Sequence, residues 1–327
     1  MKSKHKILVC GVGSIGSRHI SNLLTLGEDI LSLVTKRKEF PENWPRLEVF
    51  ESLTDALDGR NYSHALICTP TSQHREELSA LIEAGVANIY LEKPVGHSID
   101  GFEVLLRRIG EGQRIIVGYD LRFDPGLNFV RELIASGRFG RILAANAFVG
   151  QYLPNWRPHE DYRKGSSALK AKGGGVLLDL VHEFDYLYWL LGRANAVGAF
   201  YQQNPELDIE TEDLADVLIK FDSGATATVH LDYHQRILER FCVVTCTRGS
   251  IRWDLAQRKV AWVEHSGEVG ELDFSEAERN ERFVSIMSAF LSGVSDERMA
   301  SFEDGIASLK MVLAAKKSSE SHTFVAL

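Results

Sequence analysis

Three residues with side chains able to move protons occupy positions suited to catalysis: Lys93, Asp179 and His182. Lys93 follows the apolar run 86–91 after a single glutamate and precedes a proline. Ligands of open α/β sheets bind beyond the carboxyl ends of the strands, so a lysine there is placed to meet one. Histidine has an ordinary pKa near neutrality and suits the role of a base. The alternatives, a polar strand end and a structural histidine, stay open.

The segment that contains His182 predicts a helix over residues 176–191, entered through three consecutive glycines at 173–175. Residues three apart share a helix face, so Asp179, His182 and Asp185 are expected to project into one pocket. A carboxylate beside the imidazole would fix its tautomer. Lys93 would then donate to the substrate oxygen and stabilise its developing charge.

A glycine pattern near the N-terminus, Gly11-x-Gly13-x-x-Gly16, lies between an apolar strand over 6–10 and an amphipathic helix reaching about residue 26. In that context the pattern is typical of dinucleotide binding: the glycines permit a tight turn, a close approach to pyrophosphate and close helix packing. The free N–H groups at the helix N-terminus would face the phosphates. A structural glycine turn is the alternative.

The next strand, expected over 30–35, ends in Thr35-Lys36-Arg37-Lys38. A site for NAD usually has an acidic residue near this point to hold the ribose hydroxyls. A hydroxyl followed by three cations suits the 2′-phosphate of NADP instead, with Arg37 offering a bidentate contact. We therefore expect NADP in preference to NAD, although a solvated basic loop remains the alternative.

The order of predicted elements indicates two domains. Strands and helices alternate up to residue 118, which is typical of a doubly wound parallel sheet and brings the glycine loop, Thr69-Pro70 and Lys93 to one crevice. Later residues read mostly as alternating strands with separate helices, an α+β pattern on an antiparallel sheet. We expect a dinucleotide-binding domain over 1–121 and an α+β domain that supplies substrate specificity over 122–327.

Composition narrows the classes of function. The chain has 327 residues, 44% hydrophobic and 25% charged, with a net charge of −8 and no basic run, which argues against nucleic acid and anionic membrane partners. It shows no membrane span and no signal peptide, so a cytoplasmic location is expected. The four cysteines are expected to be reduced, and no zinc set or other metal site is predicted.

Taken together, these motifs resemble the Gfo/Idh/MocA family of NAD(P)-dependent sugar and cyclitol oxidoreductases. The resemblance covers nearly the whole chain and rests on the glycine fingerprint, Pro70 with His74, Glu92-Lys93-Pro94, Arg122-Phe123, Gly173-Gly174-Gly175 with Asp179, His182 and Asp185, and Glu303-Asp304-Gly305. It implies a Rossmann domain followed by a large open sheet, and pairing into a dimer or tetramer through that sheet. It also implies that Lys93, Asp179 and His182 form the catalytic group.

Within the family, the Gly-Ser-Ile-Gly-x-Arg-His match and the loop 151–157 resemble members from surface-polysaccharide and nonulosonate sugar pathways. Three positions depart from the family pattern: Thr71 and Asp120 stand where asparagine is common, and Asp179 lies three residues before His182 rather than four.

Two sets of binding residues follow from the motifs and the resemblance. The expected cofactor contacts are Gly11, Gly13, Ser14, Ile15, Gly16, Thr35, Lys36, Arg37, Thr69, Pro70, His74, Glu92 and Lys93, with Glu92 orienting Lys93. The expected substrate contacts are Arg122, Trp156, Arg157, Tyr162, Arg163 and Asp185, with Asp232 and Tyr233 as weaker candidates. The loop residues among them would grip an anionic sugar or, alternatively, only cover the sheet.

The predicted function is hydride transfer between a nicotinamide and a secondary alcohol or ketone of a sugar, sugar derivative or nucleotide sugar. Two other classes stay open. One is a non-catalytic protein that senses cofactor or sugar on the same fold. The other is a glycosidase-like or epimerase-like enzyme that recycles tightly bound NAD through a keto-sugar intermediate.

Overall fold

The computed structural model describes residues 5–45 and 47–327, which fold into two compact units. The first unit contains the described residues up to Asp120 together with Arg279–Ile306. The second contains Leu121–Glu278 and Ala307–Leu327. The first break falls at 120/121, against an expected division at 121/122, and the return of residues 279–306 to the first unit was not expected.

Two elements tie residues 279–306 to the first unit. Helix α8 (Glu281–Ser292) buries the apolar side chains Phe283, Ile286, Met287 and Phe290. Strand β15 (Ala300–Ser301) pairs antiparallel with β6 (Arg114–Val117) at the edge of the sheet. Apolar periodicity predicts such a helix but cannot say which unit it covers, because either would bury it.

The sheet of the first unit has seven strands in the order β15-β6-β5-β4-β1-β2-β3, all parallel except β15. Its remaining strands are β1 (Ile7–Cys10), β2 (Leu31–Val34), β3 (Glu48–Phe50), β4 (His64–Ile67) and β5 (Asn88–Leu91). Every residue of β1 and β4 is buried, as expected for strands covered on both faces.

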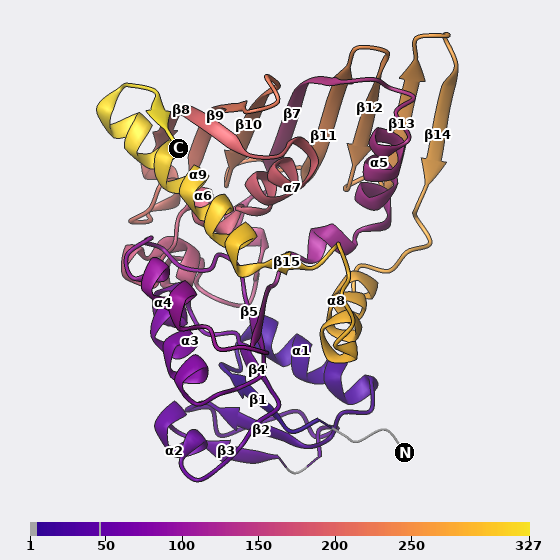
Figure 1. Ribbon diagram of the computed structural model, residues 1–327. Helices are drawn as coiled ribbons and strands as arrows, with labels where there is room; N and C mark the ends of the chain where they lie inside the picture. The colour runs from indigo at the N-terminus through magenta and orange to yellow at the C-terminus, as the bar shows by residue number, and fades with distance from the viewer. Residues whose placement is uncertain (1–4, 46) are drawn as a thin grey trace. The chain divides into compact units, whose positions relative to one another are not determined.

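Helices cover both faces of this sheet. Helices α1 (Ser14–Thr25) and α8 lie on one face, and α3 (His74–Glu83) and α4 (Phe102–Arg108) lie on the other (Figure 1). The short helix α2 (Leu53–Leu57) is capped by Ser52, whose hydroxyl accepts the Asp55 N–H. The doubly wound Rossmann arrangement expected from the sequence is confirmed.

The second unit is built on a nine-stranded sheet in the order β14-β13-β12-β11-β7-β10-β9-β8-β16. Its pairs are antiparallel except β7 with β10, which confirms the expected mainly antiparallel sheet. The strands are β7 (Ile142–Gly150), β8 (Ala194–Gln202), β9 (Leu214–Phe221), β10 (Thr226–Asp232), β11 (Glu239–Cys246), β12 (Gly249–Asp254), β13 (Lys259–Glu264), β14 (Val269–Asp273) and β16 (Val325–Ala326).

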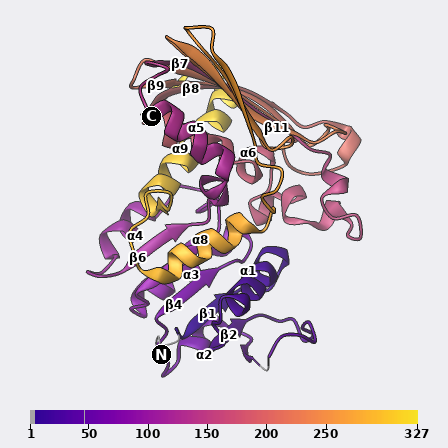
Figure 2. The same cartoon turned by 90° about the vertical axis from the view of Figure 1, so that its right-hand side faces the viewer.

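The helices of the second unit gather on one face of its sheet. They are α5 (Pro125–Ala135), α6 (Val176–Asp179), α7 (His182–Leu191) and the part of α9 (Phe302–Ser321) beyond Ile306. Figure 2 shows α5, α6 and α9 on one side of the sheet and, in the described part of the chain, no helix on the other. Strand β9 alternates buried and exposed residues accordingly, with Val217 and Ile219 buried and Leu218 exposed.

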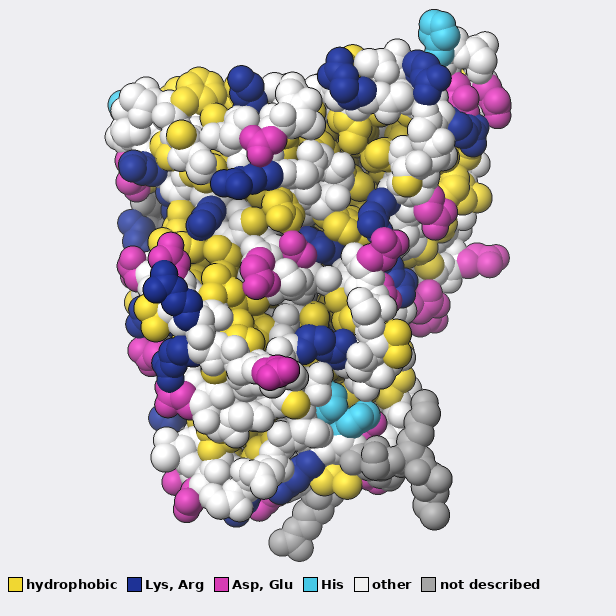
Figure 3. Space-filling view, viewed as in Figure 1, with side chains coloured by type: hydrophobic (Ala, Val, Ile, Leu, Met, Phe, Trp, Pro, Cys, Tyr) yellow, Lys and Arg dark blue, Asp and Glu magenta, His cyan; other side chains and the backbone are white. Residues whose placement is uncertain are grey.

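Short 3-10 helices fill the connections. Those near the sites discussed below are Thr71–Gln73, Asp120–Phe123, Leu153–Asn155, Tyr162–Lys164, Ser166–Ala168 and Lys170–Lys172, and Pro205–Leu207 lies beyond them. All four cysteines are buried and free, and burial raises the pKa of each thiol. None of the helices in the described ranges is long and apolar enough to cross a membrane. The face drawn in Figure 3 carries acidic and basic side chains interspersed with one another.

Candidate functional site

The glycine loop of the first unit has a geometry that only glycine tolerates at two positions. Gly11 has φ +89°, and a Cβ there would lie 2.8 Å from the Cys68 carbonyl. A Cβ on Gly16 would lie 2.1 Å from the Gly11 carbonyl oxygen. These two glycines therefore let β1, the loop and α1 pack closely against the end of β4.

Gly13 differs, because no heavy atom of the described residues lies within 4 Å of a Cβ built there. It is exposed, forms the N-cap of α1 and gives that helix end no side-chain hydrogen bond. Ser14 is exposed and Ile15 half-buried in the first turn, which contains no acidic residue. Open space before free helix N–H groups fits the pyrophosphate of a dinucleotide, so these residues would hold it.

The basic residues after β2 lie beside the same helix. The Arg37 guanidinium donates to the Ser17 hydroxyl on α1 at 3.5 Å, and the Arg37 N–H donates to the Thr35 hydroxyl at 3.1 Å. Lys38 instead forms an ion pair with Glu51. Exposed Lys36 and Arg37 are thus placed for an anionic group near the glycine loop, while the Lys38 ammonium has a carboxylate partner.

Thr69 and Pro70 follow β4, opposite the glycine loop. Both are half-buried, and the Thr69 hydroxyl donates to the Glu77 carboxylate at 2.7 Å. Burial raises the pKa of Glu77 to about 7, against the opposing effect of the Thr69 hydrogen bond. Glu77 was not a candidate in the sequence, because nothing in a helical Glu-Glu pair shows that one member turns inward.

His74 contacts protein backbone on both sides of its ring. Its Nδ1 lies 2.8 Å from the Pro94 carbonyl oxygen and its Nε2 lies 2.9 Å from the Thr69 carbonyl oxygen, and only 1% of the residue is exposed. Burial lowers the pKa of His74, while the two carbonyl acceptors favour the protonated ring. With both nitrogens engaged, His74 braces two loops rather than presenting a nitrogen to a cofactor.

Lys93 lies two residues beyond the end of β5, is half-buried and precedes Pro94 through a cis peptide bond. The Glu92 carboxylate accepts the Lys93 backbone N–H at 3.3 Å and contacts the His19 Nε2 at 2.7 Å. Glu92 and His19 are both buried. The expectation that Glu92 orients Lys93 thus has a backbone contact in its support. In the sequence, His19 stands in the helix after the glycine loop, as the last residue of the Gly-Ser-Ile-Gly-x-Arg-His match, and nothing there indicates a contact with Glu92.

The second unit separates residues that were expected on one helix. Asp179 ends α6 and His182 begins α7, because Leu180 leaves the helical region at φ −98° and ψ +34°. The prediction of one continuous helix over 176–191 is therefore wrong, and spacing on a shared helix face cannot position the pair. His182 is 7% exposed, while Asp179 is half-buried.

Asp179 is instead held by Tyr233, which the sequence made only a weak candidate. The Tyr233 hydroxyl donates to an Asp179 carboxylate oxygen at 2.7 Å, and burial beside that carboxylate raises the pKa of Tyr233 well above its usual range. The Trp156 ring lies edge-on to Tyr233 at 5.3 Å, and its indole N–H donates to the Gln151 carbonyl. The polar loop, the end of β10 and α6 thus meet at one cluster.

The three glycines before α6 have packing reasons of their own. Gly173 and Gly175 have φ values of +77° and +115°. A Cβ on Gly174 would lie 2.2 Å from the Ser166 carbonyl oxygen, and one on Gly175 would lie 2.3 Å from the Glu212 carboxylate. The glycines shape the entry to α6 and are no independent sign of ligand binding.

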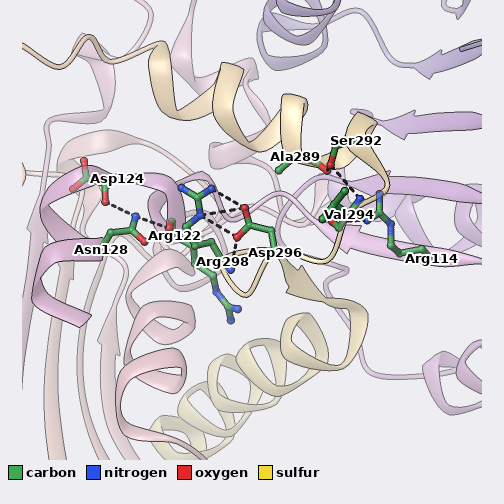
Figure 4. A network of polar contacts seen from close by, with 9 residues as sticks. All are labelled: Arg114, Arg122, Asp124, Asn128, Ala289, Ser292, Val294, Asp296 and Arg298. Carbon is green, nitrogen blue, oxygen red and sulfur yellow. Dashed lines mark hydrogen bonds and ion pairs between the residues drawn. The ribbon is translucent and has the colours of Figure 1, made fainter. Parts of the chain in front are cut away.

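Arg122 and Asp185, both expected to contact substrate, bind each other in the interior of the second unit. The guanidinium donates to the two carboxylate oxygens at 2.9 and 2.7 Å, with side-chain exposures of 2% and 1%. The Asn128 amide donates to the Arg122 and Asp124 carbonyls at 2.9 and 2.8 Å (Figure 4). This geometry contradicts a direct substrate contact and indicates a structural ion pair.

The remaining substrate candidates lie in the polar loop 151–172. Tyr162 donates to the Leu207 carbonyl at 3.0 Å, and Arg163 pairs with Asp161 at 2.8 Å, an exposed pair that lowers the pKa of the aspartate. Arg157 is exposed, and its guanidinium lies 3.8 Å from the Glu160 carboxylate. Of the two loop arginines, Arg157 has the guanidinium that lies farther from its carboxylate partner. Within the described residues, no group of three His, Cys, Asp or Glu side chains is arranged to hold a metal ion.

Comparisons with known proteins match both units. Residues 5–119 match the family model "Oxidoreductase family, NAD-binding Rossmann fold", and residues 127–252 match the "GFO/IDH/MocA C-terminal domain". Myo-inositol 2-dehydrogenase of Thermotoga maritima is 24% identical, with 98% of each chain covered. The 1,5-anhydro-D-fructose reductase of Ensifer adhaerens is 29% identical over 77% of this chain and 75% of its own. The structure of a levoglucosan dehydrogenase in complex with NADH shares the fold, with a TM-score of 0.85, 19% identity and 99% of both chains covered.

Proposed function

This chain belongs to the Gfo/Idh/MocA family of oxidoreductases, as its motifs predicted, and we propose that it oxidises or forms a secondary alcohol on a sugar or cyclitol. The observation that carries the proposal is the first unit's combination of an open glycine cradle at Gly13 with a half-buried lysine, Lys93, at the end of β5. The names of the relatives, which act on inositol and anhydrofructose, support a polyhydroxylated substrate.

The proposed chemistry assigns the handling of protons and developing charge to His182, Asp179 and Lys93. A bound nicotinamide dinucleotide would supply the hydride acceptor or donor. His182 takes the hydroxyl proton of the substrate, since imidazole suits a base near neutral pH. Asp179, oriented by the Tyr233 hydroxyl, favours the charged imidazole ring. Lys93 donates to the substrate oxygen and stabilises its developing negative charge.

For the cofactor, we propose NADP in preference to NAD. Support comes from the Thr35 hydroxyl at the end of β2, from the exposed Lys36 and Arg37, and from the placement of Arg37 beside α1. A guanidinium binds a 2′-phosphate through two parallel hydrogen bonds, which a ribose hydroxyl cannot match. In Arg37→Ala we expect the dissociation constant for NADPH to rise at least about tenfold. Lys38→Ala, which removes a cation paired with Glu51, is the matched control and should change little.

For the substrate, we propose a sugar that carries a carboxylate or phosphate, gripped by Arg157 of the polar loop. The exposed guanidinium of Arg157 supports this, as does the Trp156–Tyr233 pair that stands near the Asp179 carboxylate. Arg163 is the matched control, because Asp161 already occupies its guanidinium. Arg157→Ala should raise KM for an anionic sugar more than for its neutral analogue, whereas Arg163→Ala should raise neither.

We further propose that two copies pair through the uncovered face of the nine-stranded sheet. Phe200 is 67% exposed and Leu218 is 41% exposed on that face, and a groove of about 520 Å³ lies beside them. Phe148 stacks on Phe241 and His230 there, at 5.3 and 4.7 Å between ring centres. Exposed aromatic and aliphatic side chains in one patch are typical of a subunit interface. Phe200→Glu should convert the dimer to a monomer in size-exclusion chromatography with light scattering.

One screen tests the central proposal. Sugars, cyclitols, sugar phosphates and nucleotide sugars are offered with NAD and with NADP, while both nicotinamide absorbance and product are followed. Net reduction of the oxidised nicotinamide by a polyol, or net oxidation of the reduced nicotinamide by the corresponding ketone, is expected. Lys93→Met should lower turnover at least about 100-fold. Product without a net change in nicotinamide absorbance would identify recycling of bound cofactor instead. Cofactor binding without any product would identify a sensing protein.

A further inference from the structure

The two chain neighbours of Lys93 are both held by buried histidines. On one side, Glu92 contacts His19 Nε2 at 2.7 Å through one carboxylate oxygen and accepts the Lys93 N–H through the other. On the other side, the Pro94 carbonyl lies 2.8 Å from His74 Nδ1. The exposed fractions of His19 and His74 are 0% and 1%. The backbone that carries Lys93 is thus tied down immediately before and immediately after it.

The two anchors belong to the helices α1 and α3, which follow the glycine loop and the loop after β4. His19 lies on α1, in the second turn after the glycine loop. His74 is the first residue of α3, and its second nitrogen lies 2.9 Å from the Thr69 carbonyl in the loop after β4. The backbone on either side of Lys93 is therefore fixed relative to the two segments of the first unit that are expected to bind the cofactor, the glycine loop with its helix and the loop after β4.

The surroundings of His19 fix its ring as well as its nitrogen. Tyr90 lies edge-on at 5.1 Å and Phe283 at 6.3 Å. A ring in contact with two aromatic side chains cannot swing away from the Glu92 carboxylate without losing these contacts. The hydrogen bond between the two side chains is also buried, which makes it more costly to lose than one in water.

We propose that His19 and His74 are positioning residues that hold the backbone of Lys93, and with it the Lys93 ammonium, in register with the cofactor loops. The proposal rests on the catalytic role proposed for Lys93. Lysine has four rotatable side-chain bonds, so freedom in the backbone beneath it adds directly to the spread of positions of its ammonium. A misplacement of about 1 Å in a catalytic group can lower the rate about 100-fold.

The proposal predicts a loss in kcat with little loss in cofactor affinity. His19→Asn keeps a polar amide but is too short to reach Glu92, whereas His19→Gln restores a donor at about the length of the imidazole. His74→Phe removes both backbone contacts and keeps the ring volume. We expect His19→Asn and His74→Phe to lower kcat about 10- to 100-fold. His19→Gln should recover most of it, and the dissociation constant for the dinucleotide should stay within about threefold throughout.

The experiment uses the full chain with whichever polyol gives turnover, and measures kcat, KM, cofactor affinity by calorimetry and folding by circular dichroism. His64→Gln is the matched control, because His64 is also buried in this unit, at the start of β4, and contacts neither loop. Each substitution is repeated in a Lys93→Met background. A residue that acts through Lys93 should cost nothing more there, since its partner is already gone.

The outcomes separate the inference from the proposed function. If Lys93→Met keeps full turnover, the role of Lys93 itself is wrong. If Lys93→Met lowers turnover about 100-fold but folded His19→Asn and His74→Phe keep wild-type kcat, only the positioning role is overturned. The positioning role is also overturned if their losses persist in the Lys93→Met background or appear mainly as weaker cofactor binding. Should His74→Phe fail to fold, the contrast between His19→Asn and His19→Gln decides.

Discussion

Replacing Asp185 with asparagine tests whether the Arg122–Asp185 pair is a structural brace or a ligand site. The structure buries both side chains almost completely and joins them through two hydrogen bonds of 2.7 and 2.9 Å. The Arg122 guanidinium also lies 5.5 Å from the centre of the Trp189 ring. The substitution Asp185→Asn would keep the size of the side chain while leaving the charge on Arg122 without its carboxylate.

The expected cost follows from that burial. Removing one partner of a buried ion pair typically destabilises a protein by about 3–5 kcal/mol, because the other charge remains in a medium that solvates it poorly. For a unit of this size, such a loss lowers Tm by roughly 6–20 °C. The double variant Arg122→Met/Asp185→Leu should recover much of the loss, since an apolar pair has no charge to strand.

Urea denaturation followed by tryptophan fluorescence suits the measurement. The chain has five tryptophans, and all except Trp44 belong to the second unit, so the signal reports mainly the unit that contains the pair. Asp161→Asn is the control, because Asp161 pairs with Arg163 at the surface. Its denaturation curve should overlay that of the wild type.

The reasoning is refuted if folded Asp185→Asn loses less than about 1 kcal/mol while KM for the sugar rises. That combination would mean that Asp185 faces a ligand, as its position in the sequence first suggested. A large loss of stability with unchanged KM in the folded fraction is the result that the geometry predicts.

Three further predictions concern the first unit. Gly13→Ala should leave Tm nearly unchanged and weaken dinucleotide binding at least about tenfold, because the new methyl group meets open space in the protein but lies where a pyrophosphate would approach; calorimetry and thermal melts check both. Glu77→Gln should stabilise the protein by about 1–3 kcal/mol at pH 8 and by little at pH 4. In the folded wild type the pKa of Glu77 is raised from 4.5 to about 7, so the protonated carboxyl is favoured by folding. The wild type therefore has its full stability below pH 4.5 and loses the contribution of Glu77 as the pH rises through 7, whereas glutamine carries no charge at either pH. His64→Gln should make the free energy of unfolding less sensitive to acid. Burial lowers the pKa of His64 from 6.5 to about 4, so the wild type loses stability as the pH falls from 6.5 towards 4, by about 1–2 kcal/mol at pH 5. Urea denaturation at pH 5 and at pH 7.5 should show that loss in the wild type and not in the variant.

Features that depend on neighbours in the chain were predictable from the sequence. The alternation of apolar strands and amphipathic helices up to residue 118 predicted the parallel sheet, and the structure has it. The positions of Gly11 and Gly16 predicted a close turn, because a side chain there meets backbone only a few residues away or on the adjoining strand. Patterns of this kind reflect backbone sterics and periodic burial, which short segments already contain.

Partnerships between distant side chains were decided only by the tertiary structure. His19 and Glu92 are 73 residues apart, and Arg122 and Asp185 are 63 apart. The neighbouring sequence does not distinguish a charged residue that binds a ligand from one that pairs with another buried charge, because both positions need the same type of charged side chain. The break at Leu180 likewise escapes helical periodicity, and the return of residues 279–306 depends on which surface offers them burial. The sequence by itself therefore determined the elements and the chemistry available at Lys93, while the folded chain decided which groups hold that lysine in place and which expected ligand contacts became braces of the interior.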